Sequence, residues 1–154
     1  MKTFSTRHLV EHPADDMFAL VADVESYPDF VPPCEDLRIR GRQALDGDRE
    51  VLIADMTVGY KVFRETFTSK VTLDRPNRLI TVTYLDGPFR KLENRWRFAP
   101  EGEGACHVEF YISYEFKSRT LGLVAGAAFD RAFRQFTSAF EQRADAIYGK
   151  AGVS

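Results

Sequence analysis

The chain has few of the residues that build disulfide frameworks or metal sites. Its 154 residues include only two cysteines, Cys34 and Cys106, and neither lies in a CxxC or CxH pattern. This spacing indicates neither a disulfide framework nor a zinc site. We expect both thiols to be small core residues, because buried free cysteine is common in folded proteins.

Sequence motifs of well-known catalytic sites are missing as well. The chain contains no GxSxG, HExxH or Walker sequence, and His8, His12 and His107 have no clear serine, cysteine or metal-ligand partner. We therefore expect the three histidines on the surface. Glu65 falls on an apolar strand face by alternation, although a β-bulge would turn it outward, and both orientations remain open. The residues favour a protein that is not an enzyme.

Long apolar runs and a large excess of one charge are also missing. No run approaches the ~20 residues of a membrane-spanning helix, and the first residues lack the apolar core of a secretory signal. The net charge is −2 and the isoelectric point is about 5.9. This balance argues against a DNA-binding surface over the whole domain. We expect a single cytoplasmic domain over residues 1–154.

Alternating apolar and polar residues fill the middle of the chain. After a first strand over Thr3 to Glu11, the period becomes two from Leu37 onward, with turn sequences such as "LDGDR", "DRPNR" and "PEGEG" between the runs. This pattern predicts six further strands in an antiparallel meander with one buried face. The apolar positions include Leu52, Ala54, Met56 and Val58; Phe63, Phe67, Val71 and Leu73; Ile80, Val82 and Tyr84; Leu92, Trp96 and Phe98; and Cys106, Val108, Phe110, Ile112, Tyr114 and Phe116.

Helical patterns precede and follow these strands. Pro13 suits the first position of a short helix that runs to about Val24, and residues 25–30 have room for at most one further turn. An apolar stripe over Arg119 to about Tyr148 predicts a helix roughly 45 Å long. Since only this helix can cover the apolar sheet face, we expect an α+β fold with a curved antiparallel sheet wrapped around the long C-terminal helix.

Four segments carry a family resemblance: "YPDFVPPC", "MTVGYKVFRETFTSKV", "GPFRKLENRWRF" and "AFDRAFRQFTSAFEQRA". Together they resemble the coenzyme Q-binding protein family, within the START-like (SRPBCC, helix-grip) superfamily of polyketide cyclases and lipid-transport domains. The bacterial ribosome-association toxins (RatA) share the pattern, which extends over roughly Thr3 to Tyr148. One departure is Pro33, which stands where the family commonly has tryptophan.

The resemblance implies a hydrophobic tunnel between the sheet and the long helix. In this family the tunnel accepts a quinone with its isoprenoid tail, and the protein delivers the quinone to respiration or to quinone biosynthesis without catalysis. Ubiquinone or a related lipid would then be a bound ligand, and no cofactor is expected. Such a carrier would contact the membrane transiently, peripheral to its inner face, and Leu121, Leu123, Val124 and Phe129 with Lys117 and Arg119 form a candidate patch.

Apolar and aromatic side chains with a few polar groups are typical of a ligand pocket. We expect "ESYPDFVPPC" to form a stiff lid and "LDGPFRKL" to form an opposite gate with Phe89 as its plug. The alternative for both segments is a loop whose aromatic side chains cap the end of the core. The candidate ligand-binding residues are Tyr27, Phe30, Met56, Val58, Phe63, Phe67, Tyr84, Phe89, Trp96, Phe110, Tyr114, Phe129, Phe133 and Phe136.

Two other functions remain open from the residues. A RatA-type factor would bind the large ribosomal subunit, and it would need a basic face such as the cluster of Arg90, Lys91, Arg95 and Arg97. An aromatase or cyclase would need a pair of acids inside the pocket, and the sequence pattern predicts no such pair.

Overall fold

The computed structural model describes residues 2–31, 34–60 and 63–149, without the side chains of Tyr60 and Phe63. Its strands and helices follow in this order: β1 (Lys2–Val10), α1 (Ala14–Ala22), the 3₁₀ turn η1 (Val24–Ser26), α2 (Tyr27–Phe30), β2 (Cys34–Leu45), β3 (Arg49–Tyr60), β4 (Phe63–Asp74), β5 (Leu79–Asp86), β6 (Phe89–Glu101), β7 (Ala105–Phe116) and α3 (Arg119–Tyr148). Within the described residues, no helix combines the length and the hydropathy needed to cross a membrane.

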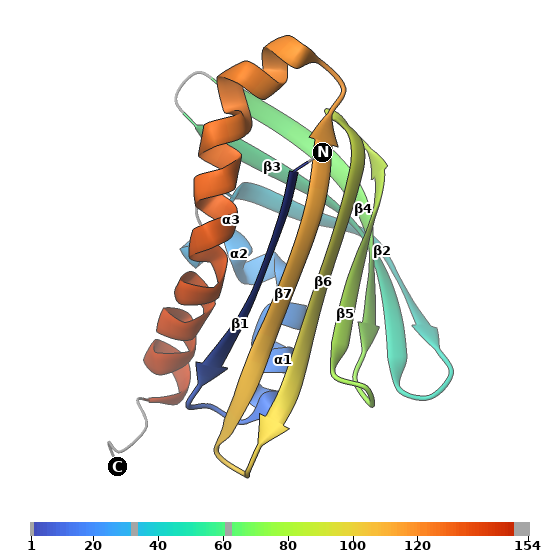
Figure 1. The fold of residues 1–154 in the computed structure, drawn as a ribbon. Coiled ribbons are helices and arrows are strands. Elements are labelled where there is room, and N and C mark those ends of the chain that lie inside the picture. Colours follow the sequence, from blue (N-terminus) through green and yellow to red (C-terminus); the bar gives the residue numbers. More distant parts are fainter. Residues whose placement is uncertain (1, 32–33, 61–62, 150–154) are drawn as a thin grey trace.

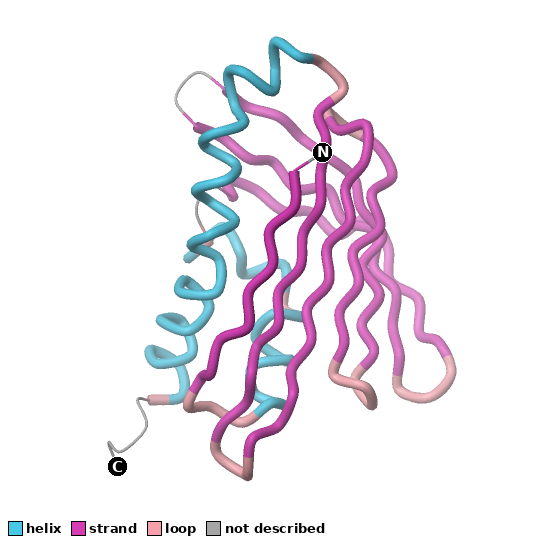
Figure 2. Tube along the Cα trace, in the orientation of Figure 1, coloured by secondary structure: helices cyan, strands magenta, loops and turns pink. Residues whose placement is uncertain are grey.

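The strands form one curved, antiparallel sheet in the order β1-β7-β6-β5-β4-β3-β2. Helix α3 runs along the concave side of this sheet, and the shorter helices α1 and α2 lie at one end of the same side (Figure 1). The tube in Figure 2 shows the same two layers, with the strands bending around the helices. The predicted α+β fold, a curved sheet wrapped around a long C-terminal helix, is confirmed.

The alternation in β4 continues without interruption along its pairing with β3. Glu65 pairs with Val58 and Phe67 pairs with Met56, with no shift of register between them. Because successive side chains alternate between the two faces of a strand, Glu65 lies on the concave face with Phe67. The bulge that would have turned it outward is absent from this pair of strands in their described part.

Helix α3 begins with an N-cap. The side chain of Ser118 accepts a hydrogen bond from the backbone N–H of Leu121 at 3.2 Å, which satisfies one of the free donors of the first turn. The predicted stripe is buried along most of its length, but Ile147 near the end is 50% exposed. The buried members of the helix are Ala125, Gly126, Phe129, Ala132, Phe133, Phe140 and Ala144.

The segment between α1 and β2 packs onto the C-terminal half of α3. The hydroxyl of Tyr27 donates to the carbonyl oxygen of Val21, and the rings of Tyr27 and Phe30 each meet the Phe140 ring edge-on at 5.2 Å. The predicted extra helical turn is present as η1 and α2. Pro32 and Pro33, which belong to the expected lid, lie outside the described residues.

Two histidines connect β1 and its following loop to α3. The Nε2 atom of His12 lies 2.7 Å from a carboxylate oxygen of Asp145, and His8 Nε2 lies 3.0 Å from Glu141. His8 is exposed as expected, whereas the surface position expected for His12 is wrong, because only 4% of this residue is exposed. A partner 133 positions away along the chain explains why local sequence did not reveal this contact.

The ring of Phe89 is the centre of an aromatic cluster at the β5–β6 turn. Phe89 is fully buried, and its ring contacts those of Phe67, Tyr84, Tyr114, Phe116 and Phe129 at centroid distances between 4.9 and 6.0 Å. Phe89 is therefore part of the core in this structure, as in the alternative of a loop whose aromatic side chains cap the core, and its role as the plug of a gate stays a prediction.

Gly87 allows the turn to approach this cluster closely. Its φ angle is +144°, and a Cβ atom at this position would come within 2.5 Å of the Cβ atom of Phe67. Glycine adopts this φ angle without a conformational penalty, and it avoids the clash because it has no Cβ atom. The turn is thereby held against the core, and the hydroxyl of Tyr84 accepts a hydrogen bond from the Phe89 N–H at 3.0 Å.

We predict that Phe89→Ala lowers the free energy of unfolding by about 3–5 kcal/mol, because it leaves a cavity among five surrounding rings. Phe136→Ala is the matched control, since Phe136 is only partly buried and its removal should cost less than half as much. Urea denaturation followed by far-UV circular dichroism measures both losses. Equal losses for the two variants would contradict the assignment of Phe89 to the core.

Candidate functional site

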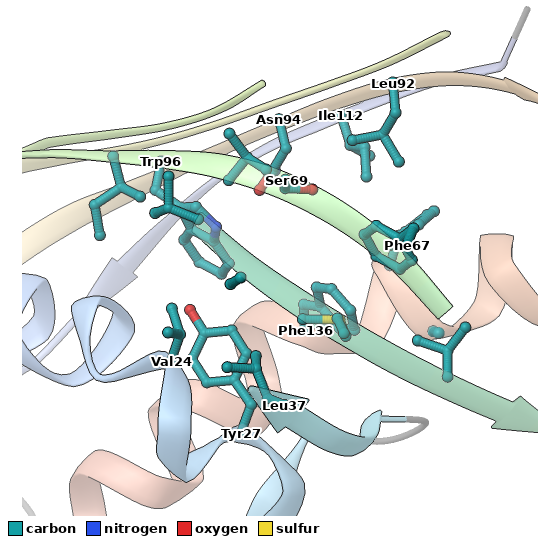
Figure 3. A pocket seen from close by; sticks show the side chains of 18 of the residues that line it. Val24, Tyr27, Leu37, Phe67, Ser69, Leu92, Asn94, Trp96, Ile112 and Phe136 are labelled. Atoms are coloured by element: carbon teal, nitrogen blue, oxygen red, sulfur yellow. The ribbon is translucent and has the colours of Figure 1, made fainter. Parts of the chain in front are cut away.

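A cavity of about 90 Å³ lies between α3 and the concave face of the sheet. The sheet and α3 supply most of its wall, and Val24 of η1 and Tyr27 of α2 close one end (Figure 3). Its lining residues are Val24, Tyr27, Leu37, Ala54, Met56, Val58, Phe67, Ser69, Val71, Ile80, Val82, Leu92, Asn94, Trp96, Ile112, Phe129, Ala132, Phe133, Phe136 and Phe140.

The helical wall follows from the spacing of residues in α3. Phe129, Phe133, Phe136 and Phe140 recur every three or four positions, so they lie on one face of the helix and all line the cavity. Ala132 lies between them, and its small side chain leaves space that a larger residue would fill. The helix therefore presents an aromatic wall with a hollow in it.

The sheet wall follows from alternation along each strand. In β6, Leu92, Asn94 and Trp96 all point to the concave side, and all three line the cavity. The Trp96 ring meets Phe140 of α3 edge-on at 5.0 Å, so the two walls are in contact at this end. Figure 3 shows Trp96 and Tyr27 near this closed end, with Phe67 and Phe136 toward the other.

Few polar groups interrupt the apolar lining. Ser69 is 5% exposed, and its hydroxyl has no hydrogen-bond partner in the described part of the chain. Asn94 donates from Nδ2 to the carbonyl oxygen of Tyr111 at 2.9 Å. Tyr27 contributes a phenol whose pKa is raised well above its ordinary value, chiefly by burial and then by nearby Cys34 and Asp23.

Both cysteines lie in the core, as expected, and neither lines the cavity. Burial raises the pKa of the Cys34 and Cys106 thiols to about 11, so both stay protonated at neutral pH. A thiol is a poor nucleophile compared with its thiolate. The cavity is therefore suited to holding an apolar molecule, with a few hydrogen-bonding groups to orient it.

The cavity brings together eight of the fourteen predicted ligand-binding residues. Their role as ligand contacts remains a prediction, but their position is as expected. The eight are Tyr27, Met56, Val58, Phe67, Trp96, Phe129, Phe133 and Phe136.

Five other predicted residues do not line the cavity. Tyr84 and Phe89 lie behind Phe67 in the aromatic cluster, and Tyr114 packs beside them. Phe110 lies behind Trp96, at a ring distance of 4.7 Å, and Phe30 packs against Phe140 at a ring distance of 5.2 Å. Alternation places Tyr84, Phe110 and Tyr114 on the concave side but does not say whether other rings lie between them and the cavity. The side chain of Phe63 lies outside the described part of the structure.

Sequence reasoning missed the polar members of the wall, Ser69 and Asn94. Both occupy positions of the inward register, two residues from Phe67 and Trp96 respectively. The signal available in the sequence was a polar residue at a strand position where alternation predicts an apolar one. Glu65, the one acid considered for the pocket, is partly buried but does not line the cavity.

Two surface features lie outside the cavity. Leu123 and Val124, near the start of α3, are 86% and 61% exposed, whereas Phe129 of the same expected membrane patch is buried. On the convex face of the sheet, Arg95 and Arg97 line a hollow together with Arg7. The guanidinium carbon of Arg95 lies 4.6 Å from the centre of the Tyr111 ring.

Comparisons with known proteins agree with this geometry. An 18 kDa protein of Caulobacter crescentus, solved in solution, superposes with a TM-score of 0.78 and 38% identity over 97% of this chain and 99% of that protein. The ribosome association toxin RatA of Vibrio cholerae is 35% identical over 97% of this chain and its own full length. Both matches extend over almost the whole chain, including the elements that form the cavity.

A third relative is the mitochondrial coenzyme Q-binding protein COQ10 homolog B of Xenopus laevis. It is 33% identical over 90% of this chain, which spans 56% of that protein. The family described as polyketide cyclase / dehydrase and lipid transport matches residues 10–141, from the end of β1 into the last turns of α3. The chain therefore belongs to the polyketide cyclase / dehydrase and lipid transport family, and the resemblance carried by its four motifs is confirmed.

Proposed function

We propose that the chain binds ubiquinone or a similar isoprenoid lipid between α3 and the sheet, and delivers it without changing it chemically. The observation that carries this proposal is the cavity, whose wall is apolar and aromatic except for a few hydrogen-bonding groups. A coenzyme Q-binding relative of 33% identity supports the choice of ligand. Delivery would serve respiratory electron transport or quinone biosynthesis.

The size of the cavity sets a condition on binding. Its volume of about 90 Å³ is less than the roughly 150 Å³ of an engineered cavity that holds benzene. A substituted quinone ring therefore requires the wall to open. Met56, Phe67 and Phe136 are partly exposed lining residues, and methionine adapts its shape easily, so movement of these side chains would enlarge the site.

We predict that Ala132→Leu prevents ligand binding by filling the hollow in the helical wall. Protein expressed in a quinone-producing bacterium is purified without detergent, and its solvent extract is analysed by mass spectrometry. Wild-type protein should carry a quinone or related lipid in near-stoichiometric amount, and Ala132→Leu should carry less than about a tenth of it.

Ala127→Leu is the control, because Ala127 is exposed on the same helix and the substitution leaves the cavity unchanged. Both variants are checked for folding by circular dichroism. An equal lipid content in wild type and Ala132→Leu would place the ligand elsewhere. Wild-type extracts that contain no lipid would contradict the carrier function.

Delivery of such a lipid requires contact with a bilayer, and one end of the molecule is suited to it. Leu123 and Val124 project from the first turns of α3, and the exposed cations Lys117 and Arg119 lie close by in the chain. Apolar side chains flanked by basic ones are typical of segments that lie in the interface of an anionic membrane. We propose that this end docks on the bilayer.

We predict that Leu123→Ser/Val124→Ser slows ubiquinone uptake from vesicles of phosphatidylcholine and phosphatidylglycerol several-fold. Quenching of Trp96, the single tryptophan of the chain, reports uptake in a stopped-flow instrument. The control is Leu9→Ser/Leu45→Ser, which alters two exposed leucines in the last residues of β1 and β2. Figure 1 shows the ends of these two strands far from the first turns of α3. Equal slowing in both double variants would contradict docking through α3.

A second candidate function is association with the large ribosomal subunit, which the name of a 35% identical relative suggests. The observation that favours it is the hollow on the convex face of the sheet. Arg7, Arg95 and Arg97 line it with one acid, Glu109, and none of the three arginines has an ion-pair partner among the described residues. Free guanidinium groups beside an aromatic ring are suited to RNA phosphates and bases.

We predict that, if the second function operates, Arg95→Glu/Arg97→Glu removes co-sedimentation with large ribosomal subunits. Binding by the wild type should weaken steeply as salt rises, because it would depend on phosphate contacts. Lys70→Glu/Arg131→Glu makes the same change of net charge at exposed positions elsewhere and should leave binding intact. Wild-type protein that fails to sediment with the subunits at low salt would contradict this function.

A further inference from the structure

The hydroxyl of Ser69 is a polar group in a place where folding alone would favour an apolar one. Ser69 is 5% exposed and lines the cavity from β4. Its Oγ atom has no hydrogen-bond partner in the part of the chain that the structure describes. A buried hydroxyl without a partner destabilises a folded protein, whereas alanine at the same place would not.

The strand geometry also sets Ser69 apart. Its inward neighbours along β4 are Phe67 and Val71, both members of the cavity wall. The pairing of β4 with β5 shifts beside this residue: Thr68 pairs with Asp86 and Ser69 pairs with Tyr84, so the extra residue of the bulge is Leu85 on β5. β-Bulges are over-represented next to active sites. The irregularity therefore occurs beside the polar position of the wall.

Two further polar groups belong to the same wall, on β6. The amide of Asn94 uses its nitrogen to bond the carbonyl oxygen of Tyr111, which leaves its own oxygen as an acceptor. The indole N–H of Trp96 forms no hydrogen bond to any described residue, although its ring is packed against Phe110 and Phe140. Figure 3 shows Ser69, Asn94 and Trp96 on the sheet side of the cavity, opposite the ring of Phe136.

We propose that Ser69, Asn94 and Trp96 form a recognition site for the oxygen atoms of an oxygenated ring in the ligand. A quinone carbonyl would accept hydrogen bonds from the Ser69 hydroxyl and the Trp96 N–H, and a quinol hydroxyl would donate to the Asn94 oxygen. The ring then lies against β4 and β6, and its apolar substituents face the phenylalanines of α3. This inference rests on the proposed lipid-binding function and specifies its ligand class: an oxygenated ring rather than a plain hydrocarbon chain.

The test compares two probes of similar size, a benzoquinone with a decyl chain and decylbenzene, which lacks the ring oxygens. Dissociation constants are measured by calorimetry. Wild-type protein should bind the quinone more tightly than the hydrocarbon. Ser69→Ala should weaken quinone binding about fivefold, the value expected for one neutral hydrogen bond, and should leave decylbenzene binding unchanged. Asn94→Leu is the second variant and should also reduce the preference for the quinone.

Ser113→Ala is the matched control, because Ser113 is 4% exposed but its hydroxyl bonds Thr3 at 3.3 Å and does not line the cavity. It should leave both dissociation constants unchanged. A second readout needs no ligand. Removal of the unpaired hydroxyl in Ser69→Ala should raise the melting temperature by a few degrees, while Ser113→Ala should lower it.

The outcomes separate this inference from the function on which it rests. If wild-type protein binds both probes equally, or if Ser69→Ala and Asn94→Leu keep the full preference for the quinone, the recognition site is overturned and the apolar cavity remains a binding site. If neither probe binds, the proposed lipid-binding function fails, and the recognition site fails with it.

Discussion

The constraint on which the rest of the structure depends is the apolar concave face of the sheet, which α3 must cover. A twisted sheet of seven strands curves strongly, whereas a long helix ordinarily curves only gently. The two surfaces therefore cannot stay in contact over their whole area. They meet where Trp96 packs against Phe140 and where Phe89 packs against Phe129. Between these points β7 stays in contact with α3 through the pairs Phe110–Phe136 and Tyr114–Phe133, and the cavity lies between α3 and the inner side of the other strands, mostly β3 to β6.

The side chains that fill the core and those that leave the cavity open lie in different parts of the same core. Around Phe89, rings fill the space, and Gly87 brings the turn close enough to close it. Around Ala132, small side chains leave the space open. Phe129 belongs to both regions, because it lines the cavity and also contacts Phe89. The opening of the cavity wall that the proposed ligand requires would therefore have a fixed boundary at this ring, and the β5–β6 turn would not need to open.

Much of the fold was predictable because it depends on local patterns. Alternation in β7 and the apolar stripe of α3 each fix an element and its buried face, and the limits predicted for α3 agree with the structure. The position of His12 was not predictable, because its partner Asp145 is brought close only by the packing of α3 against β1. The role of Phe89 depended on a turn whose approach to Phe67 is a tertiary property.

The candidate site was predictable in its apolar part and not in its polar part. Inward alternation found Phe67 and the helical stripe found Phe133, but alternation also selected Phe110, since pattern alone does not distinguish the wall of a cavity from the layer behind it. Ser69 carried a sequence signal, a hydroxyl in an apolar register, yet its meaning depends on the absence of a nearby partner in the described structure. The absence of a partner for the Ser69 hydroxyl depends on how the neighbouring strands and α3 pack around it.

Strand β6 connects the two functions that the family names suggest. Its alternation places Asn94 and Trp96 in the cavity and Arg95 and Arg97 in the hollow of the convex face. Because successive side chains of a strand point to opposite faces of the sheet, one short sequence supplies residues to both surfaces. A ligand inside the cavity and a partner on the convex face would then contact the same backbone. A slip of one residue in the register of β6 would exchange the two sets of side chains and destroy both surfaces at once.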